Sequence, residues 1–328
     1  MNLDSATIAV VIPCYGVSRH VLDVIGRIGP GCSRIYVVDD CCPEKTGDVV
    51  LRACKDPRVT VIRHNCNQGV GGAMVTGYQR AADDGADVIV KLDGDGQMDP
   101  ALLMAFAMPI ILGEADYTKG NRFFDLRHIG EMPTVRIVGN AVLSFLSKLS
   151  TGYWHIFDPT NGYTAIHSDV VRRLPLERIS RRYFFETDML FRLNTIRAVV
   201  VDVPMDARYG DEASGLRIRQ ILGEFLLNHA CNTVKRVFYN YFLRDFSLAS
   251  LELVAGLALL AFGVSYGSYH WIVSAQAGVT TPAGTVILAA LPIILAIQFL
   301  LAFFAFDIAA TPSRPIHRRR PSPMGVGE

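Results

Sequence analysis

The sequence has little charge, and neither sign is in excess. Charged residues make up 19% of the 328 residues, and 32 Lys and Arg nearly balance 31 Asp and Glu, which leaves a net charge of +1. The basic residues are not massed in one segment, so the sequence does not predict a nucleic-acid partner. Half of the residues are hydrophobic, which excludes disorder over most of the length and exceeds the share typical of a soluble enzyme.

The cysteine spacing of a zinc site or a disulfide framework is also missing. The seven cysteines include no Cys-x-x-Cys pair and have no histidine at ligand spacing. We expect the first six, which precede the apolar C-terminal stretches, to be reduced, small buried side chains. No basic segment precedes the first apolar run, which ends at Pro13, so we expect no signal peptide.

Two long stretches almost free of charge lie near the C-terminus. Residues 283–306 carry no charge, and residues 248–268 carry only Glu252, near one end. A helix of about 20 residues spans the roughly 30 Å hydrocarbon core of a bilayer. The sequence therefore predicts transmembrane helices at residues 247–269 and 283–307. Whether they pair within one chain or in a homo-oligomer stays open.

Basic residues predict the orientation of these two helices. They lie on the outer flanks: Lys235, Arg236 and Arg244 before the first helix, and Arg314, Arg318, Arg319 and Arg320 after the second. The connection at 269–282 has no Lys or Arg. The positive-inside rule then places both chain termini and the N-terminal domain in the cytoplasm. Residues 215–246 mix apolar and basic side chains, which predicts an amphipathic juxtamembrane segment, and the basic tail at 308–328 is expected to be disordered.

The N-terminal part shows alternating strand and helix signals. Short β-branched runs at residues 8–12, 35–38, 59–62 and 88–92 are separated by stretches of helical length. This order predicts an α/β domain with a mostly parallel sheet covered on both faces, over residues 1–214. Ligands bind such sheets beyond the carboxyl ends of the strands.

Acidic residues follow two of the predicted strands. Asp39 and Asp40 end one run, and Asp93, Gly94 and Asp95 follow another. Carboxylates separated by one glycine, with Gln97 two residues further, suit Mg²⁺ or Mn²⁺ bridging a diphosphate.

Two neighbouring motifs have simpler interpretations. Asp99 precedes Pro100, which predicts a helix N-cap rather than a metal ligand. The glycine-rich turn at residues 67–72 lacks the full spacing of a nucleotide-binding fingerprint, so we expect tight packing between a strand and a helix.

Four of these segments, taken together and in order, resemble the family 2 glycosyltransferases. They are Val11–Tyr15, Val37–Asp40, Asn67–Gly69 and Asp93–Gln97. Within that family the sequence is similar to dolichol-phosphate mannose synthase and to bacterial polyprenyl-phosphate glucosyltransferases with two C-terminal transmembrane helices. The resemblance implies a GT-A type fold, an inverting transfer and a bacterial inner-membrane location.

The resemblance also implies roles for individual residues. The implied nucleotide-sugar site is Pro13, Tyr15, Asp39, Asp93, Gly94, Asp95, Gln97, Arg122 and Arg208. Within it, Pro13, Tyr15 and Asp39 are implied to hold the base and ribose, and Asp93, Asp95 and Gln97 the metal ion. The implied catalytic set is Asp95, Arg122, Arg208 and Glu186. The implied acceptor side is Asp158, Asn161, Ser214 and Arg217.

The sequence departs from the family pattern in three places. The usual Asn-Glu after the tyrosine is replaced by Gly16 and Val17, an arginine by Thr164, and a lysine by the residues around 215–217. The last two departures leave the binding of an acceptor phosphate open, with Arg208, Arg217 or Arg219 as substitutes.

The leading hypothesis is an enzyme that transfers a sugar from a UDP- or GDP-linked donor to a polyprenyl phosphate. A phosphate oxygen is already ionised near pH 7 and needs no general base, whereas a hydroxyl acceptor would need one, for which Glu186 is the candidate. One alternative is transfer to a hydroxyl of a lipid-linked oligosaccharide. Another is an inactive membrane scaffold, which the intact Asp93, Asp95 and Gln97 disfavour.

Overall fold

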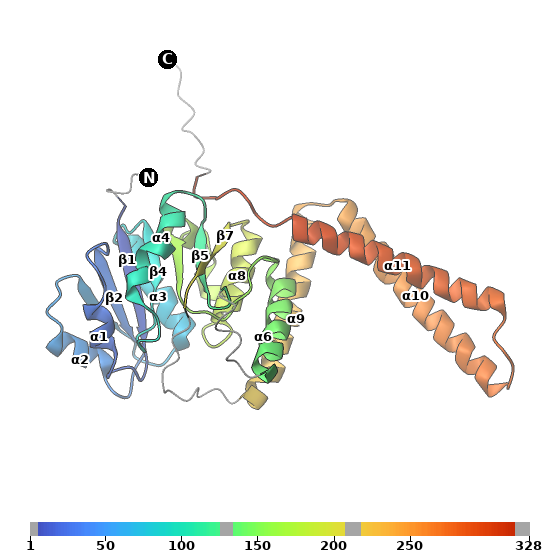
Figure 1. Ribbon diagram of the computed structural model, residues 1–328, viewed down its shortest axis with the longest axis horizontal. Helices are drawn as coiled ribbons and strands as arrows, with labels where there is room; N and C mark the ends of the chain where they lie inside the picture. The colour runs from blue at the N-terminus through green and yellow to red at the C-terminus, as the bar shows by residue number, and fades with distance from the viewer. Residues whose placement is uncertain (1–5, 125–133, 207–217, 319–328) are drawn as a thin grey trace, which may run out of the picture. The chain divides into compact units, whose positions relative to one another are not determined.

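The chain divides into two compact units. The structure, a computed structural model, describes residues 6–124, 134–206 and 218–318 (Figure 1). The first unit consists of residues 1–233 together with 312–328, and the second of residues 234–311.

A sheet of seven strands forms the centre of the first unit. The strands are β1 (Ile8–Cys14), β2 (Arg34–Asp39), β3 (Val59–Arg63), β4 (Val88–Lys91), β5 (Tyr117–Asn121), β6 (Thr164–His167) and β7 (Val200–Pro204). Their order is β3-β2-β1-β4-β6-β5-β7. Only β6 runs antiparallel to its neighbours. The predicted mostly parallel α/β sheet is confirmed.

Helices cover both faces of this sheet (Figure 1). They are α1 (Val21–Gly26), α2 (Thr46–Ala53), α3 (Gly69–Asp83), α4 (Leu103–Ile111), α7 (Ser168–Val171) and α8 (Phe185–Thr195), with the short helices η2 (Pro100–Leu102) and η3 (Leu176–Arg178), while α6 (Thr134–Thr151) packs against α8. One core contains Ala9 and Val11 with apolar residues of α3, α7 and α8, and the other contains Val10 and Ile12 with those of α1, α2 and α4. Alternate residues of β1 thus enter opposite cores, as a strand buried on both faces requires.

The reversed strand β6 determines which segments meet at the functional edge. Because β6 runs antiparallel to β4 and β5, the residues before Thr164 lie where those two strands end. Thr164 pairs with Lys91 on one side and with Lys119 on the other. The segment 158–163 therefore lies at the same edge as the residues that follow β4.

The second unit is helical. It contains the end of α9 (Ile218–Phe238), the π-helix η4 (Tyr239–Arg244), α10 (Leu248–Gln276) and α11 (Ala283–Ala309). Helices α10 and α11 are long and apolar enough to cross a membrane, and both extend beyond the predicted limits of residues 269 and 307. They lie side by side (Figure 1), and Gly256, Gly263 and Gly267 face α11 at close range. Small residues allow such close approach of membrane helices.

An ion pair is buried within this helical unit. Arg236 on α9 donates to Asp307 on α11 with Nη1 at 2.6 Å and Nη2 at 3.0 Å. The hydroxyl of Tyr241 donates to the same carboxylate at 2.6 Å. Asp307, the first charged residue after the apolar run, is therefore neutralised inside the unit.

The structure corrects the expected disorder of the tail from residue 308. Residues 308 and 309 complete α11, and the chain then returns to the first unit at residue 312. Ile316 is buried, and the backbone amides of Ile316 and His317 donate to the Asp116 carboxylate at 2.8 and 3.1 Å. A buried carboxylate needs such donors, a requirement that the composition of the tail does not reveal. Residues 319–328 lie outside the described part.

Candidate active site

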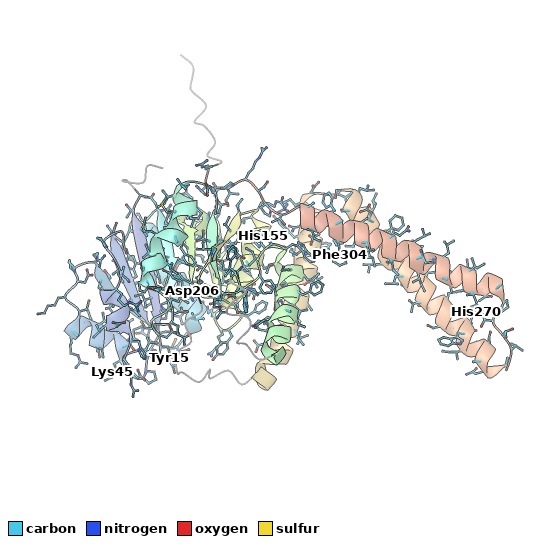
Figure 2. The ribbon with its side chains drawn as sticks, viewed as in Figure 1. Tyr15, Lys45, His155, Asp206, His270 and Phe304 are labelled. Carbon is cyan, nitrogen blue, oxygen red and sulfur yellow. The ribbon has the colours of Figure 1, made fainter. Side chains whose placement is uncertain are left out.

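Loops after the first two strands form one end of the site. Tyr15 follows β1 and is 54% exposed, and Lys45 lies in the loop after β2 (Figure 2). The two loops touch, because the Gly16 amide donates to Cys42 Sγ at 3.1 Å. Tyr15 is thus accessible to a ligand, as its predicted role toward a nucleotide base requires, and Pro13 lies just before it at the end of β1.

The two aspartates at the end of β2 accept hydrogen bonds from the surrounding backbone. Asp39 accepts the Cys42 amide at 2.8 Å and the Gly47 amide at 2.7 Å, one on each oxygen. Asp40 accepts the amides of Gln68 and Gly69 at 2.9 and 2.7 Å. Asp39 is nearly buried and braces the start of α2, so its contact with a ribose stays a prediction.

The structure bears out the capping role of Asp99, whereas Gly69 and Gly71 of the glycine-rich turn lie against residues 180–185 and not against a strand. Asp99 caps η2, with its side chain accepting the Ala101 amide. Gly77 of α3 packs against Val11 of β1, where a Cβ would lie 2.2 Å from the valine side chain. At the start of α3, Gly71 donates to the Arg181 carbonyl at 2.9 Å.

The residues after β4 form a tight loop, residues 93–97, which we call the metal loop. The Gln97 amide donates to Asp95 Oδ1 at 3.0 Å. A Cβ on Gly94 would lie 3.1 Å from Val17 and 3.3 Å from Ile12, so glycine lets the loop pass close to β1. Asp93 remains 29% exposed at its side chain.

The oxygen atoms of the metal loop fit Mg²⁺ or Mn²⁺. Asp93 and Asp95 supply hard carboxylate oxygens and Gln97 a neutral one. Among the described residues, no group of three or more His, Cys, Asp and Glu side chains could hold a metal ion. Mg²⁺ is often held by one or two carboxylates and completed by substrate phosphates. The site fits a metal ion that binds together with a diphosphate.

A second segment meets this edge from the start of β6. We call residues 158–163 the acceptor segment. Arg122, just after β5, donates to Asp158 with Nε at 2.7 Å and Nη2 at 3.0 Å. Asp158 is buried, whereas Arg122 is about one third exposed. This two-point pair fixes the guanidinium plane and leaves part of it open to a ligand.

Two buried lysines lie beneath these segments and were not assigned a role from the sequence. Lys91 Nζ donates to Asp93 Oδ1 at 2.7 Å and to the Gly162 carbonyl at 3.1 Å. Lys119 Nζ donates to the Asn161 carbonyl at 2.5 Å. A lysine inside an otherwise apolar buried strand is rare, and this signal could have revealed Lys91, whereas β5 around Lys119 contains other polar residues.

The two lysines differ in their electrostatic surroundings. Burial alone would lower the pKa of Lys91, but the nearby Asp93 and Glu186 carboxylates raise it above the ordinary value. Burial lowers the pKa of Lys119 to about 8, although Glu186 and Asp158 oppose this shift. Glu186, the predicted base, lies with Oε1 3.5 Å from Lys91 Nζ. Lys91 therefore carries a firm positive charge at the centre of the site.

The family follows from sequence comparison. The model of the Glycosyl transferase family 2 matches residues 9–174, about half of the 328 residues. The chain belongs to glycosyltransferase family 2. The resemblance inferred from the four motifs is confirmed.

Relatives within glycosyltransferase family 2 include enzymes named for lipid phosphates. The chain is 30% identical to an undecaprenyl-phosphate mannosyltransferase of Micrococcus luteus over 222 residues, which cover 66% of this chain and 90% of that one. It is 29% identical to a polyprenol monophosphomannose synthase of Mycolicibacterium smegmatis, over 60% of this chain and 75% of that one.

A solved structure shares the fold of most of this chain. It is a glucosyl-3-phosphoglycerate synthase of Mycobacterium tuberculosis in complex with Mn²⁺, UDP and glucosyl-3-phosphoglycerate. The TM-score is 0.54 at 16% identity, over 71% of this chain and 80% of that one. The predicted GT-A type fold is confirmed.

Part of the family's expected site lies outside the described residues. Arg208, Ser214 and Arg217 fall within the gap at 207–217, and the side chain of Arg219 is likewise not described. Of the other predicted residues, Arg122 pairs with Asp158, and Asp93 and Glu186 both lie close to Lys91, which was not predicted. Thr164, which replaces a family arginine, is buried between the two lysines.

Proposed function

We propose that this chain transfers a sugar from a nucleotide-sugar to a polyprenyl phosphate at the cytoplasmic face of a membrane, with inversion at the anomeric carbon. The observation that carries the proposal is the meeting of the metal loop and the acceptor segment at one sheet edge, where Lys91 bonds to both. Two helices long enough to cross a membrane follow in the same chain, and relatives carry names of lipid-phosphate transferases.

The donor half of the reaction uses the metal loop. Asp93, Asp95 and Gln97 would hold Mg²⁺ or Mn²⁺, which neutralises charge on the departing diphosphate when bound. The partly exposed guanidinium of Arg122, held by Asp158, would add a second positive group. Fixed positive groups at a developing negative charge are a major source of catalysis.

The acceptor half favours a phosphate over a hydroxyl. Glu186 is the candidate base for a hydroxyl acceptor. Its carboxylate lies 3.5 Å from the ammonium of Lys91, a position that suits a counter-ion to the lysine. A phosphate acceptor is ionised near neutral pH and needs no base. Attack on the sugar from the side opposite the diphosphate then gives inversion.

The path of the chain supports a cytoplasmic site. The segment 234–311 leaves the first unit and residues 312–318 return to it. A pair of crossings returns a chain to the side where it started, in keeping with the basic residues on both outer flanks. Both ends of the helix pair and the first unit would thus face the cytoplasm, which in a bacterium means the inner face of the inner membrane.

Product analysis tests the proposal. Full-length protein in detergent with Mn²⁺ is given UDP- and GDP-sugars and undecaprenyl phosphate, and the lipid fraction is examined by mass spectrometry. A lipid that gains one hexose and is absent with Asp95→Ala supports the proposal. Slow donor hydrolysis without a lipid product would favour a hydroxyl acceptor on a longer lipid-linked glycan, and binding without any turnover would favour a scaffold.

A further inference from the structure

Two lysines stand in one row across the sheet. The register places Thr164 of β6 between Lys91 of β4 and Lys119 of β5, and all three residues are buried. A buried ammonium group is costly unless it is paired. Two buried ammonium groups with only one strand between them are not explained by packing alone.

Their partners lie in two different parts of the site. Lys91 joins the metal loop to the acceptor segment, through Asp93 Oδ1 and the Gly162 carbonyl. Lys119 bonds to the acceptor segment alone, at the carbonyl of Asn161. The consecutive carbonyls of residues 161 and 162 are thus each held by one lysine.

A side chain at position 162 would displace the ends of Lys91 and Asp93 from this arrangement. A Cβ there would lie 2.5 Å from Lys91 Nζ and 2.6 Å from Asp93 Oδ2. The acceptor segment is therefore in direct contact with a candidate metal ligand and its lysine. A displacement of the acceptor segment would therefore also move the metal loop, and the reverse.

We propose that Lys91 and Lys119 are positioning residues that hold the acceptor segment against the metal loop, and that Lys91 also restrains Asp93 from binding a free divalent ion. The second part follows from charge. An ammonium group 2.7 Å from Asp93 Oδ1 repels a dication at that carboxylate, whereas the negative charge of a diphosphate offsets the repulsion. Metal ion and nucleotide then bind together rather than one before the other. The roles of the metal loop, the nucleotide and the acceptor in this proposal rest on the proposed function.

Metal titration separates this role from a merely structural one. Free Mn²⁺ is followed by electron paramagnetic resonance on the full-length protein, without nucleotide and with UDP or GDP. Lys91→Met removes the charge at similar side-chain length, and we expect it to bind free Mn²⁺ about tenfold more tightly than wild type. Turnover with the lipid acceptor should nevertheless fall by about two orders of magnitude, because the acceptor segment is released. Simple loss of folding cannot tighten metal binding.

Lys119→Met is the matched control in the same row. It leaves Asp93 and its lysine in place, so its Mn²⁺ affinity should stay within about twofold of wild type while the KM for the acceptor rises about tenfold. Lys91→Arg keeps the charge and should keep the weak affinity for free Mn²⁺.

Two results would overturn the proposal. One is an unchanged or weaker affinity for free Mn²⁺ in Lys91→Met, and the other is the same response in both lysine variants. If Lys91→Met does not fold, Lys91→Gln, which can still donate to Asp93, takes its place with the same expected increase. If wild-type protein forms no lipid product, the proposed function fails, but the Mn²⁺ titrations still decide the role of Lys91.

Discussion

Buried charges occur in both units, but they are satisfied in different ways. In the helical unit, Asp307 receives Arg236 at both oxygens and Tyr241 as well, and the pair is almost fully buried. At the sheet edge, Lys91 is buried but its partner Asp93 keeps part of its carboxylate exposed. A closed arrangement serves the structure, whereas one that keeps an oxygen accessible can serve a ligand.

The largest effect is expected on sugar transfer, at the sheet edge where carboxylate oxygens stay accessible. Asp95→Ala should lower sugar transfer by about three orders of magnitude, because a metal ligand and its charge are lost. Thermal unfolding should change little, since Asp95 is only partly buried. Steady-state assays and melting curves measure both quantities.

Asp99 offers a nearby control for Asp95. Asp99→Ala removes a cap and should cost about 1 kcal/mol of stability, while transfer stays within a few fold of wild type. If Asp99→Ala reduced transfer as much as Asp95→Ala, the assignment of the metal ligands would be wrong.

The next largest effect is expected at the buried pair of Arg236 and Asp307, where a substitution should change stability and not activity. Arg236→Met leaves the Asp307 carboxylate buried without its main partner and should destabilise the helical unit by about 3 to 5 kcal/mol. Unfolding of the full chain in detergent measures this loss. UDP or GDP binding with Mn²⁺ at the sheet edge should be unchanged.

Replacing all three polar partners by apolar residues tests whether the buried pair only compensates its own charges. The triple variant Arg236→Met, Asp307→Leu and Tyr241→Phe should regain most of the lost stability, because apolar residues of similar volume can replace a buried ion pair. A triple variant as unstable as the single one would mean that the pair has a role beyond compensating its own charges.

The smallest effect is expected where the tail returns to the first unit. Burial and the nearby His317 lower the pKa of His167 to about 4, and the two rings stack at 4.3 Å. Because the folded state keeps His167 neutral, the fold loses stability as the pH falls from the ordinary histidine pKa of 6.5 toward the lowered pKa of about 4. Residues 312–318 should therefore become more accessible to proteases over this pH range.

The carboxylate of Asp116 extends this loss of stability to lower pH. Burial raises the pKa of Asp116, but hydrogen bonds from His317, Val199 and Ile316 outweigh it and the net shift is downward. Its stabilising contribution is present above the ordinary value of 3.8 and is lost below it. His167→Asn, which can still accept the Asp169 amide, should remove only the part between pH 6.5 and 4. Protection of the tail that does not change with pH in wild type would contradict this account.

The sequence predicts the sheet and much of the site because the signals are local. Alternating apolar strands and the aspartates at their ends place Asp39 and Asp93 at one edge without any knowledge of distant contacts. The lysine row could not be predicted in this way, since Lys91 and Lys119 meet only through the reversed strand β6. Ile316 and His317 escaped prediction for a similar reason, because their partner Asp116 lies about 200 residues earlier in the chain.

Phosphorus NMR of the lipid product tests the central claim most directly. Undecaprenyl phosphate, incubated with the full-length protein, Mn²⁺ and the donor that supports turnover, starts as a phosphate monoester. Transfer to its oxygen converts it to a phosphodiester, and this new signal, absent with Asp95→Ala, is the result that we predict. A lipid that remains a monoester while the donor is consumed would contradict the claim that the acceptor is a polyprenyl phosphate.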